Sequence, residues 1–554
     1  MLRLASSEPL ERSFAMQKVF GDKKRIDLGS SEFREFITKG HLYVDKTGFI
    51  EHVLDEASKL LLFTRPRRTG KSLNLDMLRT FLDCKLDTKE LFKGLYIEGR
   101  PVFGQINSCP VIYLNFKEMR ASNYRKSLKA MLRDNASMYL SDGQIDPEIG
   151  KYFNDLDVDD TGMLRALTKN IHGAHGIRPY VLIDEYDKLL MDNLSASEYE
   201  TIRDWLKGVF ESSLKDNHHL EKGIMVGVTR VSQESLLSGL NNLDVYDVFR
   251  PSVFDGDFSL TEEEVNELLG GEQLEAARDW YNNYRVGNEK LFTMYSVLSY
   301  AKNGVLDNYW GMSGTMDMLI DALNSQRANA VTDLLSTGRE IETKIERRMS
   351  LKKLRSGTID DGSFYSFAVQ TGYLTYELHQ KGDVENIYRL RCPNKELIRV
   401  WHDFILSEVV NGKHNSLRDI FRYISDTEDF SHNFQDFISF QLSSFDVGKE
   451  LEKTYHVLVF GLILGAGFKC SSNRESGHGR YDLWLEGPGF NVIIEFKKTN
   501  KETDDLEALA NAAIGQINSR KYYAKFPANV PLYKVGVGCY KAECCVITVP
   551  HDFG

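Results

Sequence analysis

The chain has 554 residues, of which 42% are hydrophobic and 27% are charged, and its formal net charge is −11. A chain of this length predicts about three domains, because single hydrophobic cores stop growing well below it. The acidic balance excludes a protein that attracts nucleic acid over its whole surface, so any such binding needs a local basic patch.

Cysteine usage and hydropathy predict where the chain works. Its 7 cysteines are scattered and lack paired CxxC spacing, which disfavours a zinc site and favours a reduced intracellular chain. No apolar run reaches the roughly 18 residues that span a bilayer. The N-terminus also lacks the apolar core of a signal peptide. We therefore expect a cytoplasmic protein with no membrane partner.

The first informative stretch is KLLLFTRPRRTGKS, residues 59–72. An apolar run leads into a turn at Gly70, and an amphipathic helical pattern follows it. A strand, a turn and a helix start present backbone N–H groups to a phosphate. Lys71 adds a charge for the outer phosphates, and the hydroxyl of Ser72 can ligate Mg²⁺. Arg65 stands where the first glycine of G-x-x-x-x-G-K-[ST] is expected.

Just upstream, residues 43–47 (YVDKT) fit either a strand end with a turn or a wall of the nucleotide pocket, and composition favours the first interpretation.

Short apolar runs then alternate with longer helical patterns, which predicts a parallel sheet covered on both faces. The run 180–183 ends in Asp184 and Glu185, at the strand end where α/β sheets bind ligands. We predict that Asp184 holds Mg²⁺ through water and that Glu185 polarises the attacking water. The alternative is a helix start with acidic first-turn residues. The run 223–228 ends in Thr229, where a sensor of the γ-phosphate is expected.

The middle of the chain changes character. Thr261 and Glu264 have capping-box spacing, and the helical periodicity that follows predicts a helical lid up to residue 345. The basic run 346–355 fits a solvated helix face, with contact to nucleic acid as the alternative. A polar stretch from roughly Ser425 to Gln435 predicts a linker before the last domain.

The last hundred or so residues carry a second set of charged residues. A hairpin is expected from 481–485 and 492–496, and Glu495 and Lys497 point to the same side because they are two apart. Asp482 and Glu495 supply the hard oxygen ligands that Mg²⁺ needs, and Lys497 can lower the pKa of the attacking water. Glu452, on a preceding helix, can complete the metal shell, and Gln516 lies on a following helix. The alternative is an edge strand with solvated charges, but the unbroken apolar run before Glu495 favours a covered strand.

In this order, the motifs resemble those of the AAA-ATPase-like family found beside a nuclease-like C-terminal domain of the PD-(D/E)XK superfamily. The matching stretches are YVDKTGFI (43–50), RPRRTGKS (65–72), VLIDEYDKLL (181–190), VSQESLLSGLNNL (231–243), WYNNYRVG (280–287), TGYLTYE (371–377), CPNKE (392–396), YHVLVFGLILG (455–465), NRESGHGRYDLWL (473–485) and IIEFKK (493–498).

The resemblance implies roles for named residues. The family's phosphate loop commonly has arginines where the first glycine is expected, so the nucleotide would be bound by Arg67, Arg68, Thr69, Gly70, Lys71 and Ser72, with Asp184 and Thr229. Glu452, Asp482, Glu495 and Lys497 match the active-site quartet of the nuclease superfamily, with Gln516 as an accessory, most like the exonuclease-related branch. Thr69 and Arg230 depart from the family pattern, which more often has an aromatic residue and a lysine there.

We therefore expect an α/β chain in which a P-loop ATPase parallel sheet, a helical lid and a middle module precede an α/β restriction-endonuclease-like domain. The expected parts are a lead-in (1–25), an AAA-like P-loop ATPase domain (26–260), the helical lid (261–345), a mixed module compatible with a winged helix (346–430) and a PD-(D/E)XK nuclease-like domain (431–554).

The predicted function is a nuclease that depends on Mg²⁺ and is controlled by ATP, with Mn²⁺ as an alternative ion at the nuclease site. Its expected partner is nucleic acid, in the first place DNA, and a homo-oligomer is compatible with the sequence. Defence against foreign DNA is an analogy with other ATPase–nuclease pairs. The main alternative is a nucleotide-dependent switch or scaffold whose C-terminal domain binds nucleic acid or a partner without cleaving it. A structural protein with two inactive sites is a third interpretation.

Overall fold

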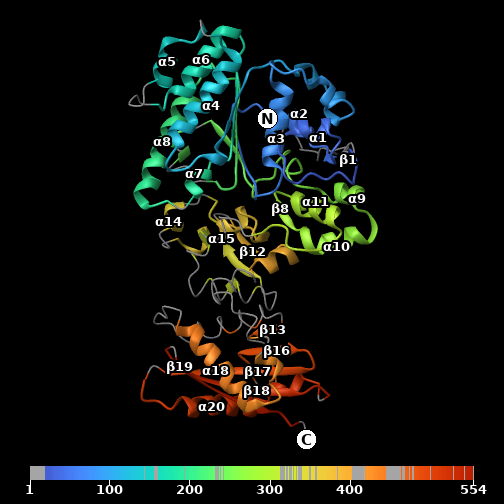
Figure 1. Cartoon of the computed structure of the whole chain (residues 1–554), viewed down its shortest axis with the longest axis vertical. Helices are drawn as coiled ribbons and strands as arrows, with labels where there is room; N and C mark the ends of the chain where they lie inside the picture. The colour runs from blue at the N-terminus through green and yellow to red at the C-terminus, as the bar shows by residue number, and fades with distance from the viewer. Residues whose placement is uncertain are drawn as a thin grey trace, which may run out of the picture. The chain divides into compact units, whose positions relative to one another are not determined.

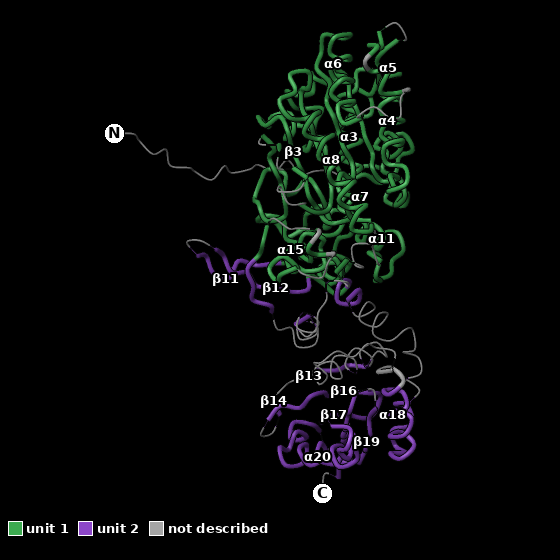
Figure 2. Tube along the Cα trace, turned by 90° about the vertical axis from the view of Figure 1, so that its left-hand side faces the viewer, with its two compact units in different colours: residues 1–321, 345–375, 393–395 green, residues 322–344, 376–392, 396–554 purple. Residues whose placement is uncertain are grey.

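The protein is described from a computed structural model. The described residues are 19–141, 144–154, 160–192, 194–230, 236–237, 239–240, 242–311, 318–319, 322, 327, 330–331, 334, 340–347, 351–355, 359–382, 385–401, 417, 420–443, 459, 463, 468–472, 475–476, 479–499, 501–527, 529–541 and 543–552. They form two compact units, which Figure 2 shows in green and purple. Unit 1 comprises residues 1–321, 345–375 and 393–395, and unit 2 comprises residues 322–344, 376–392 and 396–554.

Unit 1 is built on a five-stranded parallel sheet of order β4-β5-β6-β3-β7. Its strands are β3 (Leu60–Thr64), β4 (Val111–Asn115), β5 (Tyr180–Asp184), β6 (Gly223–Gly227) and β7 (Leu243–Tyr246). Strand β6 therefore lies between β3, which precedes the phosphate loop, and β5, which ends in Asp184. Parallel strands bring their carboxyl ends to one edge, so this order places three predicted site segments together.

Both faces of this sheet are covered by helices. Figure 1 shows α4 (Tyr124–Tyr139), α6 (Met163–His175) and α8 (Ala196–Leu214) on one side, and α2 (Gly48–Asp55) and α3 (Lys71–Leu82) on the other. The shorter helices of this part are α1 (Phe33–Thr38), α5 (Pro147–Asn154) and α7 (Lys188–Met191), and the small strands β1 (Val19–Phe20) and β2 (Tyr43–Val44) pair with each other.

The strand sequences explain this two-sided burial. Alternate residues such as Leu61 and Phe63 belong to the same buried cluster as α2 and α3. The intervening residues Leu60 and Leu62 are buried as well, and side chains in a strand alternate between faces. Apolar residues without a polar break therefore form a strand covered on both sides, as predicted.

The segment after the sheet is only partly helical. It contains α9 (Glu262–Leu268), α10 (Gly271–Tyr281) and α11 (Met294–Asn303), and the capping box of Thr261 and Glu264 is present. A hairpin of β8 (Tyr284–Val286) and β9 (Glu289–Leu291) interrupts the helices, and residues 341–344 form strand β10 (Ile341–Lys344). The described part of 261–345 thus contains strands as well as the helices expected from periodicity.

The next segment contributes to both units. Helices α14 (Leu351–Arg355) and α15 (Asp361–Gln370) belong to unit 1. Strands β11 (Thr375–Gln380) and β12 (Ile387–Arg391) form a three-stranded sheet with β10, in the order β10-β12-β11.

The C-terminal part of unit 2 contains a mixed sheet of order β13-β16-β17-β18-β19. Its strands are β13 (Lys469–Ser472), β16 (Leu483–Gly487), β17 (Phe490–Lys498), β18 (Leu532–Tyr540) and β19 (Glu543–Pro550). The expected hairpin is present, because β16 pairs with β17 in antiparallel fashion. Strands β17 and β18 are parallel and are connected through α20 (Leu506–Ser519) and the short 3-10 helix η7 (Tyr522–Lys525). A second, two-stranded hairpin is formed by β14 (Glu475–Ser476) and β15 (Gly479–Arg480).

The linker predicted from Ser425 to Gln435 is wrong. Helix α18 (Thr427–Ser443) occupies this stretch, and Phe430, Phe434 and Ile438 lie in the same buried cluster as the C-terminal sheet. These side chains recur at four-residue intervals and so share one face of the helix. The polar residues between them made the stretch look like a linker.

None of the described helices has the length and apolar character that crossing a membrane requires.

Candidate functional site

The phosphate loop connects β3 to α3 in unit 1. Gly70 lies at the N-cap of α3 with a φ of 83°, and a Cβ built there would lie 3.1 Å from the Sδ of Met294. Both the left-handed conformation and the close neighbour favour glycine at this position. The loop therefore keeps its backbone open at the helix start, which is the arrangement that cradles a phosphate.

Lys71 is the buried cation of this loop. Its Nζ donates to the carbonyls of Arg65 at 3.1 Å and Pro66 at 2.7 Å. Burial lowers the pKa of Lys71, and the negative charges of Glu185 and Asp184 oppose that shift. The predicted lysine and the predicted carboxylates thus lie within electrostatic range of one another.

The arginines of the loop differ in their contacts. Arg65, at the position of the missing glycine, is buried and donates from Nη1 to the carbonyl of Tyr246 on β7 at 2.6 Å. It links β3 to the neighbouring strand. Arg68 is exposed, lies 4.3 Å above the ring of Tyr295 and donates to the carbonyl of Tyr309, while Arg67 is half-buried. Arg67 and Arg68 are therefore the loop arginines on the accessible side.

Asp184, at the end of β5, fits a cation site. It is 1% exposed, and its Oδ1 has no hydrogen-bond partner among the described residues. Burial raises the pKa of Asp184 to about 6, although a hydrogen bond from the Ser72 side chain acts in the opposite direction. A buried carboxylate oxygen without a partner, beside a hydroxyl, is the donor set that Mg²⁺ prefers. Glu185 follows with a φ of 55°, an uncommon conformation for a residue other than glycine.

Thr229 follows β6 and is completely buried. Its amide and its Oγ1 donate to Oδ2 of Asp187 at 2.8 and 2.9 Å, and the amide of Val228 donates to the same oxygen at 3.0 Å. Asp187 thus holds the end of β6 against the turn after β5. We did not predict this role from the sequence, and the only signal was its position two residues after Glu185.

The YVDKT stretch forms a buried polar network. Lys46 donates to both carboxylate oxygens of Glu264 at 2.7 Å and to the carbonyl of Gly256 at 2.9 Å. Oδ1 of Asp45 accepts from the amide and hydroxyl of Thr47. Strand β2 ends immediately before this network and α2 begins immediately after it. These contacts support the interpretation as a strand end and turn, and they tie the N-terminal segment to the start of α9.

The second candidate site lies in the C-terminal sheet, where Asp482 and Glu495 are neighbours. The amide of Asp482 donates to Oε2 of Glu495 at 3.3 Å, and the amide of Phe496 donates to Oδ2 of Asp482 at 2.8 Å. Lys497 Nζ lies 3.8 Å from Oε1 of Glu495. The two carboxylates and the ammonium group expected from the hairpin are therefore brought together.

Gln516 on α20 completes this cluster. Its Oε1 accepts from Lys497, while its Nε2 donates to Glu495 and, at 3.0 Å, to the hydroxyl of Tyr522. Gln516 therefore orients both the lysine and the buried carboxylate. Tyr522 was not among the predicted residues, because nothing in its spacing from Gln516 indicated a contact.

The charges of the cluster favour a divalent cation. Glu495 is buried, and burial followed by the neighbouring charge of Asp482 raises its pKa well above the ordinary value, with Lys497 acting in the opposite direction. Two adjacent carboxylates are costly to ionise together, and a bound cation removes that cost. Among the described residues no three His, Cys, Asp or Glu side chains gather as a metal-ligand set, and Glu452 lies outside those residues.

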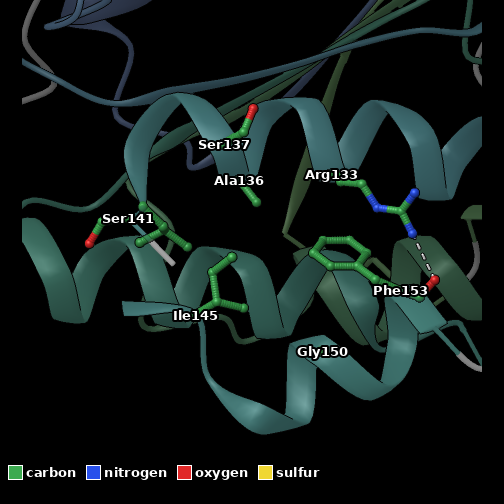
Figure 3. Close-up of a pocket in the computed structure, with 8 residues that line it drawn as sticks. Arg133, Ala136, Ser137, Ser141, Ile145, Gly150 and Phe153 are labelled. Atoms are coloured by element: carbon green, nitrogen blue, oxygen red, sulfur yellow. Dashed lines mark hydrogen bonds between the residues drawn. The ribbon is translucent and has the colours of Figure 1, made fainter. Parts of the chain in front are cut away.

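A hollow between α4 and α5 is separate from both clusters. It is lined by apolar side chains including Leu140, Ile145 and Phe153, and Arg133 at its edge donates to the carbonyl of Phe153 at 2.8 Å (Figure 3). Its lining includes none of the predicted site residues.

Comparisons with known proteins agree with this arrangement. The family described as "Predicted AAA-ATPase" matches residues 27–237, and the PD-(D/E)XK nuclease superfamily matches residues 450–549. An uncharacterized protein in the vnfD 5′ region of Azotobacter chroococcum mcd 1 is 26% identical over 537 residues, which cover 93% of this chain and 96% of that protein.

Two solved structures from Aeropyrum pernix are also similar, at 12% identity each. The ORC1 protein in complex with DNA has a TM-score of 0.24, with 66% of this chain and 91% of that chain covered. The ORC2 protein, in ADPNP–ADP complexes, has a TM-score of 0.29, with 71% and 99% covered. TM-scores of this size do not establish a shared fold.

The two family matches confirm the resemblance read from the motifs, and these families generally use a nucleotide and a divalent metal. The chain therefore contains an AAA-ATPase-like domain and, after it, a domain of the PD-(D/E)XK nuclease superfamily.

Proposed function

We propose that this protein binds and hydrolyses ATP in unit 1 and that the nucleotide controls metal-dependent cleavage of DNA by the C-terminal domain. The observation that carries the proposal is the connected cluster of Asp482, Glu495, Lys497 and Gln516 in a domain of a nuclease superfamily. The buried Asp184 beside the phosphate loop supports the nucleotide half.

In the nucleotide site, the N–H groups of the loop and the side chains of Lys71, Arg67 and Arg68 bind the phosphates. Lys71 is already directed at the loop, so a short movement away from the carbonyl of Pro66 brings its ammonium to a phosphate. Ser72 and Asp184 hold Mg²⁺, which when bound offsets charge on the phosphates. Glu185 polarises the attacking water, and Thr229 lies at the end of β6 beside the terminal phosphate. Thr69 and Gly70 complete the loop.

In the nuclease site, Asp482 and Glu495 hold Mg²⁺ or Mn²⁺, and Glu452 is a further proposed ligand. The bound ion supplies charge stabilisation at the phosphodiester. Lys497 holds a positive charge beside the attacking water, and Gln516 keeps that ammonium in position through its Oε1. Burial of Glu495 keeps competing water away from the side chain that must carry a negative charge.

Three wider features belong to the same proposal. None of the seven cysteines, all of which are described, forms a disulfide, which supports a reducing compartment such as the cytoplasm. A homo-oligomer and a role in defence against foreign DNA are compatible with an ATPase–nuclease pair.

The test is a cleavage assay on labelled double-stranded and single-stranded DNA, with ATP and either Mg²⁺ or Mn²⁺. We expect Asp482→Asn and Lys497→Ala to lower cleavage at least about 100-fold, because each removes a group that stabilises charge at the reacting phosphate. ATP binding by both variants should equal that of the unmodified protein. Glu486→Gln is the matched control, because Glu486 is an exposed carboxylate on the same hairpin.

Cleavage that persists in both variants would overturn the assignment of the site. DNA that is bound but never cut, under either ion, would instead favour the alternative of a nucleotide-dependent switch or scaffold.

A further inference from the structure

Residues 370–372 approach the nucleotide site from outside both family matches. They comprise the last residue of α15 and the two residues after it, far along the chain from the phosphate loop and from β6. They nevertheless contact both of those segments within unit 1.

Gln370 contacts the end of β6. It is 1% exposed, and its Oε1 accepts from the backbone amide of Arg230 at 2.9 Å. Arg230 follows Thr229 directly, and its Nη1 donates to Asp247 at 3.0 Å. The side chain of Gln370 thus fixes the backbone immediately after the residue proposed to lie beside the terminal phosphate.

Two donors in this contact have no acceptor in the part of the chain that the structure describes. Nε2 of Gln370 and Nε of Arg230 are both buried and without a hydrogen-bond partner among the described residues. Buried donors in folded proteins nearly always have an acceptor, and a ligand atom is one group that can supply it. Two such N–H groups at the segment that follows β6 suit an anion.

Gly372 contacts the phosphate loop itself. It has a φ of 90°, and a Cβ built there would lie 2.6 Å from the ring of Trp310 and 3.0 Å from Cβ of Pro66. The carbonyl of Pro66 is the group that accepts from Lys71 at 2.7 Å. When Lys71 turns to a phosphate, the carbonyl of Pro66 loses this hydrogen bond. The backbone of Gly372 packs against the ring of Pro66 and would be affected by the change.

We propose that residues 370–372 are a sensor of the terminal phosphate of the nucleotide, with Gln370 donating toward the phosphate and Gly372 following the movement of the phosphate loop. This inference rests on the proposed nucleotide site. The segment is well placed to pass the signal on, because the chain continues from Gly372 through Thr375 into β11, a strand of the sheet formed with β10 and β12. A movement of residues 370–372 would therefore be felt first at Thr375, where β11 begins.

The first experiment measures the affinity of the full chain for MgATP and for MgADP by titration calorimetry. Gln370→Met keeps the length of the side chain but removes its amide. We expect it to weaken MgATP binding about tenfold while leaving MgADP binding unchanged, because only ATP carries the phosphate that the amide reaches. Gln380→Met is the matched control, since Gln380 is an exposed glutamine on β11, and it should retain the preference of the unmodified chain.

The second experiment follows amide hydrogen exchange in residues 371–380 with and without MgATP. Nucleotide should change exchange there in the unmodified chain and not in Gly372→Ala, whose methyl group would press on Pro66 and Trp310. Gly304→Ala is the matched control, because Gly304 has a similar φ of 69° but no atom within 4 Å of a built Cβ. Gly304→Ala should respond like the unmodified chain.

The outcomes separate the two proposals. If the unmodified chain binds neither nucleotide, the proposed function fails and this inference fails with it. If both nucleotides bind but Gln370→Met keeps the preference for MgATP, or if exchange in 371–380 does not respond to MgATP, the sensor is overturned while the nucleotide site stands.

Discussion

At the scale of single residues, Asp184 shows how a fold can prepare a carboxylate for a cation. The side chain is buried at a strand end, and its Oδ1 lacks a hydrogen-bond partner in the described part of the chain. Burial raises its pKa to about 6, so the folded chain without ligand favours the neutral form relative to the unfolded chain. The negative charge that Mg²⁺ requires is therefore held at a cost in stability.

Asp184→Asn should raise the free energy of unfolding of the nucleotide-free protein, by about 1–3 kcal/mol near pH 8. The sign follows from the raised pKa of Asp184. The stability that the neutral carboxyl of Asp184 contributes is fully present below the pKa of the unfolded chain and is lost as the pH rises through about 6. The variant replaces this carboxyl by a neutral amide at every pH, so its gain in stability should shrink near pH 5. ATP hydrolysis should fall at least about 100-fold. Chemical denaturation at both pH values and a phosphate-release assay measure the two effects.

Asp160→Asn is the control for this prediction. Asp160 is also buried, but its Oδ1 accepts from the indole of Trp205 at 2.7 Å and lies 3.6 Å from Arg125. Its charge is thus compensated, and the variant should destabilise the protein. A stability gain in Asp160→Asn, or a loss in Asp184→Asn near pH 8, would contradict the account.

Residues whose placement follows from a local pattern could be predicted from the sequence. Lys71 and Ser72 follow a glycine turn, and Glu495 and Lys497 are two apart on one strand, so the geometry of each pair is fixed by neighbouring residues. Asp187 and Gln370 were missed because their contacts join segments distant in sequence, such as Gln370 and Arg230. No local spacing encodes such a contact. Tyr522 was missed for another reason, because it lies in η7, after the end of the helix that carries Gln516. Glu452 stays a prediction, because it lies outside the described residues.

At the scale of elements, β6 organises the nucleotide site, because it lies between the strands that end in the phosphate loop and in Asp184. The end of β6 is held by Asp187, which lies in the turn after β5 and accepts hydrogen bonds from Val228 and Thr229. A Cβ built at Gly227 would lie 2.5 Å from the ring of Tyr186 and 2.6 Å from Oδ1 of Asp187. The strand can approach this turn so closely only because residue 227 has no side chain.

Gly227→Ala should therefore destabilise unit 1 by about 1–3 kcal/mol and reduce ATP hydrolysis, since the added methyl group pushes apart β6 and the turn that carries Glu185. Gly223→Ala, at the other end of the same strand, should cost less, because the nearest atom to its built Cβ is Cδ2 of Leu60 at 2.9 Å, the end of a flexible side chain. Thermal unfolding and hydrolysis rates of the two variants test this. Equal losses in both variants would argue against a specific role for the Gly227 contact.

Elements were predictable where one physical signal dominated. The apolar runs of β3 and β5 indicated covered strands, and the spacing of Thr261 and Glu264 indicated a helix start. Helix α18 was missed because polar residues separate its buried phenylalanines. The strand order β4-β5-β6-β3-β7 was not predicted, since it depends on pairing between segments more than 100 residues apart, such as Leu60 and Gly223.

At the scale of the whole molecule, the chain divides into two compact units with separate cores. One buried cluster contains Phe63, Leu182 and Val226 of the parallel sheet, and another contains Leu485, Ile494 and Val537 of the C-terminal sheet. The unit boundaries differ from the predicted domain boundaries, because residues 345–375 group with the parallel sheet and residues 322–344 do not. Separate cores imply that each unit contributes its own unfolding transition.

Thermal unfolding of the full chain should therefore show two transitions, each of which responds to its own ligand. MgATP at 100 times its Kd should stabilise the unit that contains Lys71 by about 2.7 kcal/mol, because a ligand that binds only the folded state adds its binding free energy to stability. Mn²⁺ without nucleotide should raise the transition of the unit that contains Asp482 and Glu495. In Lys71→Ala only the response to MgATP should disappear, and in Asp482→Asn only the response to Mn²⁺. Calorimetric scans distinguish these outcomes, and a single transition that both ligands raise would show instead that the two units unfold together.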